Sequence, residues 1–287
     1  MDRIWQWAWD RYATRYTRAT LVVVFFMSVP IYLLLTLSIV ASEKSGRYLE
    51  VAALTVAAVL VLEFLMFFPG RREMGRVEKW AAGDDADRAA VLEGTYAYSR
   101  RMSTQIVWTV GIWATVLSAV VAAMAGATGW RIVQYGVLGA AFGVGVQLIA
   151  FHSAQESILR PVRAAVAGET GIGDSLPRSS PSFAARSNVS MVAVAFVFGL
   201  TSATLAVVVA RAVDAPVLVV VIAGALALGF AAPISVGLGF SPSLQPIRDL
   251  AQGAQRVASG DYSGRLPVVQ DDDLGALAAS FNRMQAG

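Results

Sequence analysis

Six long apolar segments limit the folds open to this chain more than any other feature of its sequence. They cover residues 20–42, 49–68, 104–126, 132–151, 189–210 and 216–239 of the 287 residues. A helix of about 20 apolar residues crosses a bilayer and satisfies its backbone hydrogen bonds within the segment. Hydrophobic residues make up 56% of the chain and charged residues 15%, which is more apolar than an ordinary soluble domain. The sequence therefore predicts an all-α membrane protein with six transmembrane helices in residues 20–240.

The connections between these segments alternate between short and long. Residues 43–48, 127–131 and 211–215 are tight turns, whereas 69–103 and 152–188 are long and polar. Of the 23 Lys and Arg residues, 19 lie in the long connections and the two terminal segments, and only four lie at the tight turns. Because Lys and Arg concentrate in cytoplasmic loops, we expect three helical hairpins with both termini in the cytoplasm. The protein is then a multi-pass protein of the cell's inner (plasma) membrane.

Residues 1–19 precede the first apolar segment and predict a cytoplasmic amphipathic helix. The aromatic residues that share one face of it are Trp5, Trp9, Tyr12 and Tyr16. The arginines that share another face are Arg11, Arg15 and Arg18. One interpretation is a helix in the headgroup layer of the bilayer, with the arginines toward anionic lipids. The other is an extension of the first span that packs on neighbouring helices, and the sequence leaves both open.

The apolar segments begin with a period near 85 residues, and glycines follow the even-numbered ones. Gly83 comes after the second segment, Gly168 after the fourth and Gly260 after the sixth. Glycine ends helices because it adopts positive φ without strain. We therefore expect each even-numbered span to continue into the cytoplasm as a helix that ends at one of these glycines. Pro233 lacks a backbone N–H, and we expect it to kink the sixth span.

Three polar residues in or at the ends of the spans form a candidate intramembrane site: Glu63, Gln147 and His152. A carboxylate at the depth of Glu63 costs a few kcal/mol unless it is protonated or paired. The functional interpretation is a polar site that binds a cation, a proton or a lipid carboxyl group. The structural one is a protonated Glu63 that donates one hydrogen bond between helices. Since the external turns are short, we expect any stimulus to arrive through the bilayer, as a lipid or hydrophobic ligand between helices.

The residue inventory excludes several kinds of chemistry. Cysteine is absent and His152 is the only histidine, so the chain cannot form a disulfide, a His-rich metal site or a His-based triad. No Walker loop, nucleophile elbow or HExxH sequence is present. We expect no catalytic residue, no metal site and no cofactor in this chain, and no nucleic-acid partner.

Residues 241–287 show the spacing of a helix pair. Apolar residues recur at intervals of three, four and three at Ile247, Leu250, Ala254 and Val257, and again at Leu274, Leu277, Phe281 and Met284. The pattern predicts helices over 243–259 and 272–287. The connector over 260–271 contains apolar Leu266 and Val268, and it is long enough to return along the first helix, so the helices run parallel. Because one narrow stripe on each helix cannot be buried within a single pair, we expect a homodimer with a parallel four-helix bundle.

This segment resembles a HAMP domain, a signal relay between membrane helices and cytoplasmic output domains. The residues that carry the resemblance are Pro246, Leu250, Gly260, Asp272, Asp273, Leu274, Gly275, Leu277, Phe281, Asn282 and Met284. The family usually has Asp-Glu where this chain has Asp272-Asp273, a departure that keeps the charge. The resemblance implies that this helix pair passes a signal from the membrane helices to an output domain.

Six spans followed by such a segment are further similar to the membrane-anchored class III adenylate cyclases of mycobacteria. The resemblance implies a membrane anchor or sensor for a homodimeric receptor enzyme that makes cyclic AMP from ATP. Its catalytic domain, with ATP and Mg or Mn, would follow the HAMP segment and lies outside these residues. Histidine kinases, diguanylate cyclases and chemoreceptors also use HAMP domains and remain alternative outputs. A transporter or a purely structural membrane anchor are alternatives of another class.

Overall fold

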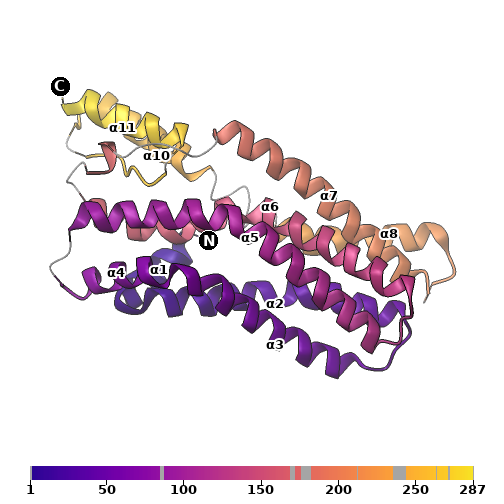
Figure 1. Ribbon diagram of the computed structural model, residues 1–287. Coiled ribbons are helices and arrows are strands. Elements are labelled where there is room, and N and C mark those ends of the chain that lie inside the picture. Colours follow the sequence, from indigo (N-terminus) through magenta and orange to yellow (C-terminus); the bar gives the residue numbers. More distant parts are fainter. Residues whose placement is uncertain are drawn as a thin grey trace.

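The computed structural model describes residues 2–84, 87–168, 172–175, 182–211, 213–234, 244–262, 264–270 and 272–286, and its regular elements are helical (Figure 1). The helices are α1 (Asp2–Tyr12), α2 (Tyr16–Ser42), α3 (Tyr48–Phe67), α4 (Arg71–Ala81), α5 (Arg88–Met124), α6 (Trp130–Ala167), α7 (Phe183–Val209), α8 (Pro216–Ile234), α10 (Gln245–Ala258) and α11 (Asp273–Ala286). Short 3-10 turns cover Ala13–Arg15, Phe68–Gly70 and Ile172–Ser175.

Five helical stretches within the described residues are long and apolar enough to cross a membrane. They are Arg3–Ser42, Tyr48–Ala81, Gln105–Met124, Trp130–Ala167 and Phe183–Val209. The described apolar part of α8, Pro216–Gly229, is shorter than the other five. The observed fold is therefore all-helical, with several helices that have the length and composition of membrane spans, and the sixth span stays a prediction. Pro233 lies in the last turn of α8, where side chains fall outside the described residues, so its kink also stays a prediction.

The spans pair as three helical hairpins, α2–α3, α5–α6 and α7–α8, whose tight turns lie together at one end of the molecule (right in Figure 1). Polar contacts join the three turns. Glu43 Oε1 accepts hydrogen bonds from Arg131 Nη2 and from the Tyr135 hydroxyl, both at 2.6 Å. Arg211 donates to the carbonyl oxygen of Ser42. Two of the few basic residues at this end thus hold one hairpin against another.

The helices that follow the second and fourth spans extend beyond the apolar segments, as expected. After α3, the turn Phe68–Gly70 leads into α4, and α6 runs on without a break to Ala167. Gly83, Gly168 and Gly260 follow α4, α6 and α10 with φ angles of 93°, 48° and 84°. These are left-handed conformations that glycine adopts without strain, and they stop each helix at its predicted place.

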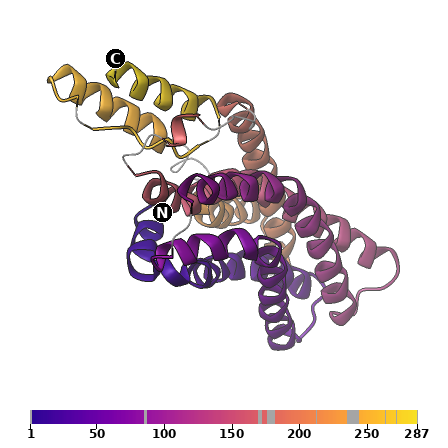
Figure 2. The ribbon, with the colours of Figure 1, turned by 60° about the vertical axis from the view of Figure 1, so that its left-hand side comes forward.

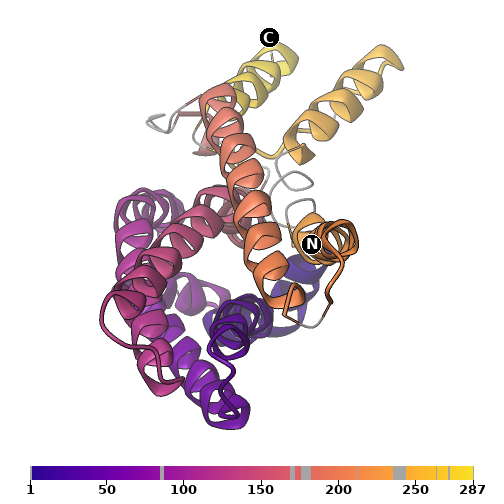
Figure 3. The ribbon, with the colours of Figure 1, turned by 90° about the vertical axis from the view of Figure 1, so that its right-hand side faces the viewer.

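One apolar core lies within the hairpins and includes Tyr32, Val59 and Val121. A second apolar core lies at the end opposite the turns. It is formed by α1, α4, the first turns of α5 and the last turns of α6, and its buried residues include Ala8, Trp9, Tyr16, Met74, Val77, Leu92, Leu159, Val162 and Val166. The helix pair α10 and α11 lies beside this core, and its two helices run side by side in the same direction (Figure 2). Within the membrane-span hairpins, α2 contacts α3, α5, α6 and α7, and Figure 3 shows this arrangement from the turn end.

The N-terminal segment forms α1, a 3-10 turn and the start of α2, in place of one helix over 1–19. The break lets the rings of Trp9 and Tyr16 pack edge to face, with centroids 5.2 Å apart. Trp5 and Trp9 are buried, and the Tyr16 hydroxyl donates a 2.7 Å hydrogen bond to the carbonyl oxygen of Ile158. Trp5, Trp9 and Tyr16 therefore pack on neighbouring helices, in line with the second of the two interpretations, whereas Tyr12 of the same predicted face is 42% exposed. The arginines of the other face, Arg11, Arg15 and Arg18, are exposed.

Candidate functional site

The connector between α10 and α11 packs into the groove that the two helices form. Leu266 and Val268 of the connector are buried with Ala278 and Ala279 of α11, and Leu250 and Phe281 pack against them. A connector that returns along the first helix makes the pair parallel, as the spacing predicts. One chain thus forms a parallel helix pair that buries its own connector.

The helix pair carries a row of apolar side chains that one chain leaves partly uncovered. Ile247, Leu277 and Met284 are 42%, 54% and 63% exposed. Their seam neighbours are Leu250, Val257, Leu274 and Phe281, which are half-buried, and Ala254, which is exposed. We call these eight residues the helix-pair seam. Apolar seams of this spacing are buried by knobs-into-holes packing against further helices, so the seam has the arrangement that the expected homodimer requires.

The start of α11 explains why the sequence reads Asp-Asp-Leu-Gly here. Asp272 Oδ1 accepts hydrogen bonds from the backbone N–H groups of Leu274 (3.0 Å) and Gly275 (3.1 Å), which caps the helix. A Cβ atom on Gly275 would lie 2.0 Å from the carbonyl oxygen of Gln270. The connector therefore passes so close to the first turn of α11 that only glycine fits.

Asn282 of α11 is hydrogen-bonded to the connector at Leu266. Its Oδ1 accepts a 2.7 Å hydrogen bond from Leu266 N, and its Nδ2 donates to Leu266 O at 3.0 Å. The side chain is buried, so both of these bonds are made in a low-dielectric surrounding where an unpaired amide would be costly. Asn282 thus sets the register of the connector on the helix.

Replacing Gly275 by Ala is expected to loosen the connector and α11, because the new methyl group overlaps the Gln270 carbonyl. Overpacking of this kind costs about 1–3 kcal/mol. Gly94→Ala is the matched control, since a Cβ there meets no atom within 4 Å and the helix gains a better former. Hydrogen exchange of residues 264–286 in the purified chain measures the difference. Equal protection in the Gly275→Ala chain and the parent chain would contradict this reading of the site.

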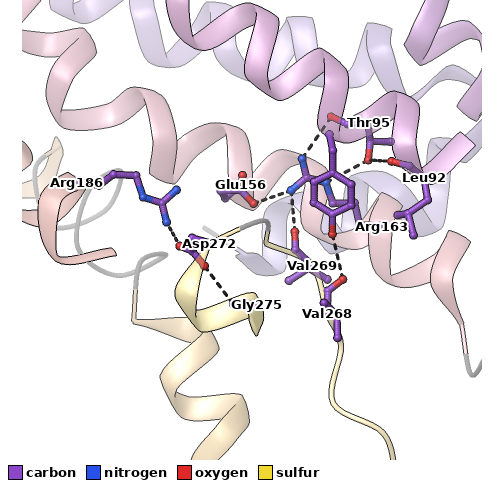
Figure 4. Close-up of polar contacts among 10 residues, drawn as sticks. Leu92, Thr95, Glu156, Arg163, Arg186, Val268, Val269, Asp272 and Gly275 are labelled. Atoms are coloured by element: carbon purple, nitrogen blue, oxygen red, sulfur yellow. Dashed lines mark hydrogen bonds and ion pairs between the residues drawn. The ribbon is translucent and has the colours of Figure 1, made fainter. Parts of the chain in front are cut away.

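Arg163 of α6 holds the connector from the other side (Figure 4). It is 0% exposed, and its Nη1 donates 2.7 Å hydrogen bonds to Val269 O and to Glu156 Oε2. Its Nε and Nη2 donate to the hydroxyl (3.2 Å) and the carbonyl oxygen (3.3 Å) of Thr95. The guanidinium is thus bonded to α5, to α6 and to the connector at once. A buried charge of this kind is stable only when it is paired and hydrogen-bonded.

Tyr96 of α5 completes this contact. The Arg163 guanidinium lies 4.0 Å from the centre of the Tyr96 ring, a cation–π geometry. The Tyr96 hydroxyl donates a 3.2 Å hydrogen bond to Val268 O. Two successive carbonyl groups of the connector, those of Val268 and Val269, are therefore held by α5 and α6. We call Arg163, Thr95, Tyr96 and Glu156 the Arg163 cluster.

Ion pairs around the Arg163 cluster attach the helix pair at three further points. They are Arg160–Asp249, Arg186–Asp272 and Arg265–Asp174. In addition, Phe183 N at the start of α7 donates a 2.8 Å hydrogen bond to Asp273 Oδ1. The extensions of α6 and α7 beyond the apolar segments thus contact both helices of the pair.

Sequence reasoning did not identify Arg163 as a site residue. The signal was present, because Leu159, Val162 and Val166 mark the apolar face of this part of α6 and Arg163 lies on that face. An arginine among buried apolar positions indicates a partner elsewhere in the chain. Its partners Thr95 and Val269 lie 68 and 106 residues away along the chain and leave no local trace.

The structure brings together two of the three residues of the candidate intramembrane site. Glu63 and Gln147 line one cavity of about 180 Å³ among α1, α2, α3, α5 and α6. The Ser28 hydroxyl donates a 2.8 Å hydrogen bond to Glu63 Oε1. The side chain of His152 lies outside the described residues. Within the described residues no group of three or more acidic residues or histidines could hold a metal ion.

Comparison with known proteins identifies one part of the chain. Residues 241–287 match the family model of the HAMP domain. Neither the curated proteins nor the solved structures that were compared with the chain include a match. The chain is thus a run of apolar helices followed by a HAMP domain.

Proposed function

We propose that this chain is the membrane anchor, sensor and HAMP relay of a homodimeric receptor. The observation that carries the proposal is a HAMP domain whose connector is bonded, through the Arg163 cluster, to extensions of the helices that precede it. A displacement of α5 or α6 would move Val268 and Val269 directly. The link that follows α8 supplies a second, covalent route into α10.

The proposed topology places both termini and the HAMP domain in the cytoplasm. The Arg-rich segments, including α1, α4 and the HAMP domain, lie at the end opposite the tight turns (Figure 1), which agrees with the positive-inside rule. The exposed Arg11, Arg15 and Arg18 then face the inner leaflet, where anionic lipids attract them.

The proposed dimer forms through the helix-pair seam, and its output domain follows it. The resemblance to mycobacterial class III cyclases favours an adenylate cyclase, whose active sites lie between two catalytic subunits, so that a HAMP dimer that holds both subunits could set activity. That domain would bind ATP and Mg or Mn. A histidine kinase, a diguanylate cyclase or a chemoreceptor fits the HAMP domain equally, and the residues encoded after Gly287 decide among them.

A fusion experiment tests whether residues 1–240 sense or only anchor. Residues 1–287 are joined to a class III cyclase catalytic domain, and cyclic AMP production is measured in vesicles of varied lipid composition. We expect activity to change with the lipids, because the short external turns leave the bilayer as the main contact of the spans. In the control fusion an unrelated dimeric anchor replaces residues 1–240, and the lipid dependence should disappear. Equal regulation of both fusions would indicate a purely structural anchor.

A further inference from the structure

The cavity that Glu63 and Gln147 line has the size of a small amphiphile. Its volume is about 180 Å³, which compares with about 30 Å³ for each water in the liquid and with an engineered 150 Å³ cavity that binds benzene. A space of this size accommodates a polar head and several carbon atoms. Its walls are mainly apolar side chains from α2, α3 and α5, such as Ile31, Leu62 and Ile106.

Polar side chains interrupt these apolar walls, among them Ser28, Tyr32, Glu63, Gln147 and Gln155. Glu63 is 5% exposed, and among the described residues the Ser28 hydroxyl donates a hydrogen bond to it. Tyr32 and Gln155 are 7% and 9% exposed, and Gln147 is half-buried. A carboxyl group and two carboxamides that line one cavity offer acceptor oxygens to the N–H groups of a ligand.

The charge of the lining decides which head group fits. Among the described residues that line the cavity, none is Lys or Arg, and Glu63 carries the only carboxyl group. Tyr98 also lines the cavity, and burial raises the pKa of its hydroxyl to about 12, with the charge of Glu73 adding to the shift, so this phenol stays neutral. An anionic head would face the Glu63 carboxyl without a cation to pair with, which is strongly unfavourable in a low-dielectric site.

We propose that this cavity binds a small amphiphile with a primary ammonium head. An ammonium group offers three N–H donors. Glu63 accepts one in a charge-assisted hydrogen bond, and the carboxamide oxygens of Gln147 and Gln155 accept the others. The alkyl or aromatic tail lies against the apolar wall. The inference deepens the proposed sensor function, because it gives the sensed molecule a chemical class. Its biological meaning rests on the proposed function, but the binding itself does not.

Direct binding to the purified chain tests the site without any output domain. Hexylamine, hexanol and hexanoate have one tail and three different heads, and each is dialysed to equilibrium against the chain in phosphatidylcholine nanodiscs, with empty nanodiscs subtracted. We expect saturable binding of one hexylamine per chain, about tenfold or more tighter than either other probe. Equal or tighter binding of hexanol or hexanoate, or no saturable hexylamine binding, overturns the proposal.

Two substitutions on one helix assign the binding to the carboxyl group. Glu63→Gln is expected to weaken hexylamine binding about tenfold and to leave hexanol binding unchanged, because only the ammonium head uses the charge. Glu50→Gln makes the same chemical change at an exposed position of α3 and should change neither. If Glu63→Gln does not fold, Gln147→Leu removes one acceptor and should weaken hexylamine binding severalfold. Unchanged hexylamine affinity in the folded variant would refute the binding site. A fusion enzyme whose activity does not change with the lipids would refute only the sensor function.

Discussion

Replacing Arg163 by Met is expected to release the HAMP connector from the membrane helices. The change removes a buried charge with its hydrogen bonds to Val269, Glu156 and Thr95, and it leaves the Glu156 carboxylate without this ion pair. Removing one partner of a buried pair costs about 3–5 kcal/mol. Methionine keeps the length and flexibility of the stem, so the apolar packing around it changes little. The expected loss of stability therefore comes from the polar contacts of the guanidinium.

Hydrogen exchange measures this release region by region. In the Arg163→Met chain we expect faster exchange in residues 264–270 and in α11, with the α2–α3 hairpin unchanged, because local openings affect contiguous units. Arg160→Met is the comparison three residues earlier, where the pair with Asp249 is partly exposed. Such pairs contribute roughly 0–1 kcal/mol, so its effect should be small. Equal exchange of the connector in the parent and Arg163→Met chains would refute the role of this residue.

Replacing Leu277 by Asp is expected to separate the two copies of the proposed dimer while leaving each chain folded. Leu277 is 54% exposed in a single chain, so a carboxylate there costs the monomer little. In a symmetric dimer both copies would bury an unpaired charge at the seam, with a cost of several kcal/mol. We expect the dissociation constant to rise about 100-fold or more, which corresponds to about 2.7 kcal/mol.

Sedimentation of the purified chain in detergent or nanodiscs measures its oligomeric state. Arg283→Asp is the control, since it places a carboxylate at an exposed position of α11 that is not three or four residues from any seam residue, and dimerisation should persist. Thermal unfolding confirms that both variants retain the fold. A parent chain that stays monomeric with a well-folded helix pair would refute the proposed relay, because its seam would need no second copy.

Local patterns in the sequence predicted the helices and their ends well. Gly83, Gly168 and Gly260 stop three helices at the expected places with positive φ. The three-four-three spacing predicted α10 and α11 to within two residues at each end. The sequence left the position of the N-terminal aromatic face open, because amphipathicity shows that a face is apolar but not whether lipid or protein covers it. The structure places Trp5 and Trp9 against protein.

Some of the candidate site residues were likewise identified from the sequence, and others only from the structure. The resemblance to HAMP domains identified Gly275 and Asn282, and the structure supplies the reasons: a backbone approach that excludes Cβ and a paired amide on the connector. The Arg163 cluster was missed, because its partners Thr95 and Val269 lie 68 and 106 residues away along the chain. Hydropathy places Glu63 inside a span, but it does not show that Gln147 lines the same cavity.

The sequence by itself therefore determined a run of apolar helices, the glycines that end their extensions, and a parallel helix pair with an apolar seam. Helix length, helix caps and the period of apolar residues depend on neighbours within a few positions, so they can be read locally. Only the tertiary structure decided that Arg163 holds the connector and that Glu63 and Gln147 share a cavity. These residues meet because separate hairpins pack together, and the partner that covers an apolar or charged face is chosen by shape and hydrogen bonding in three dimensions.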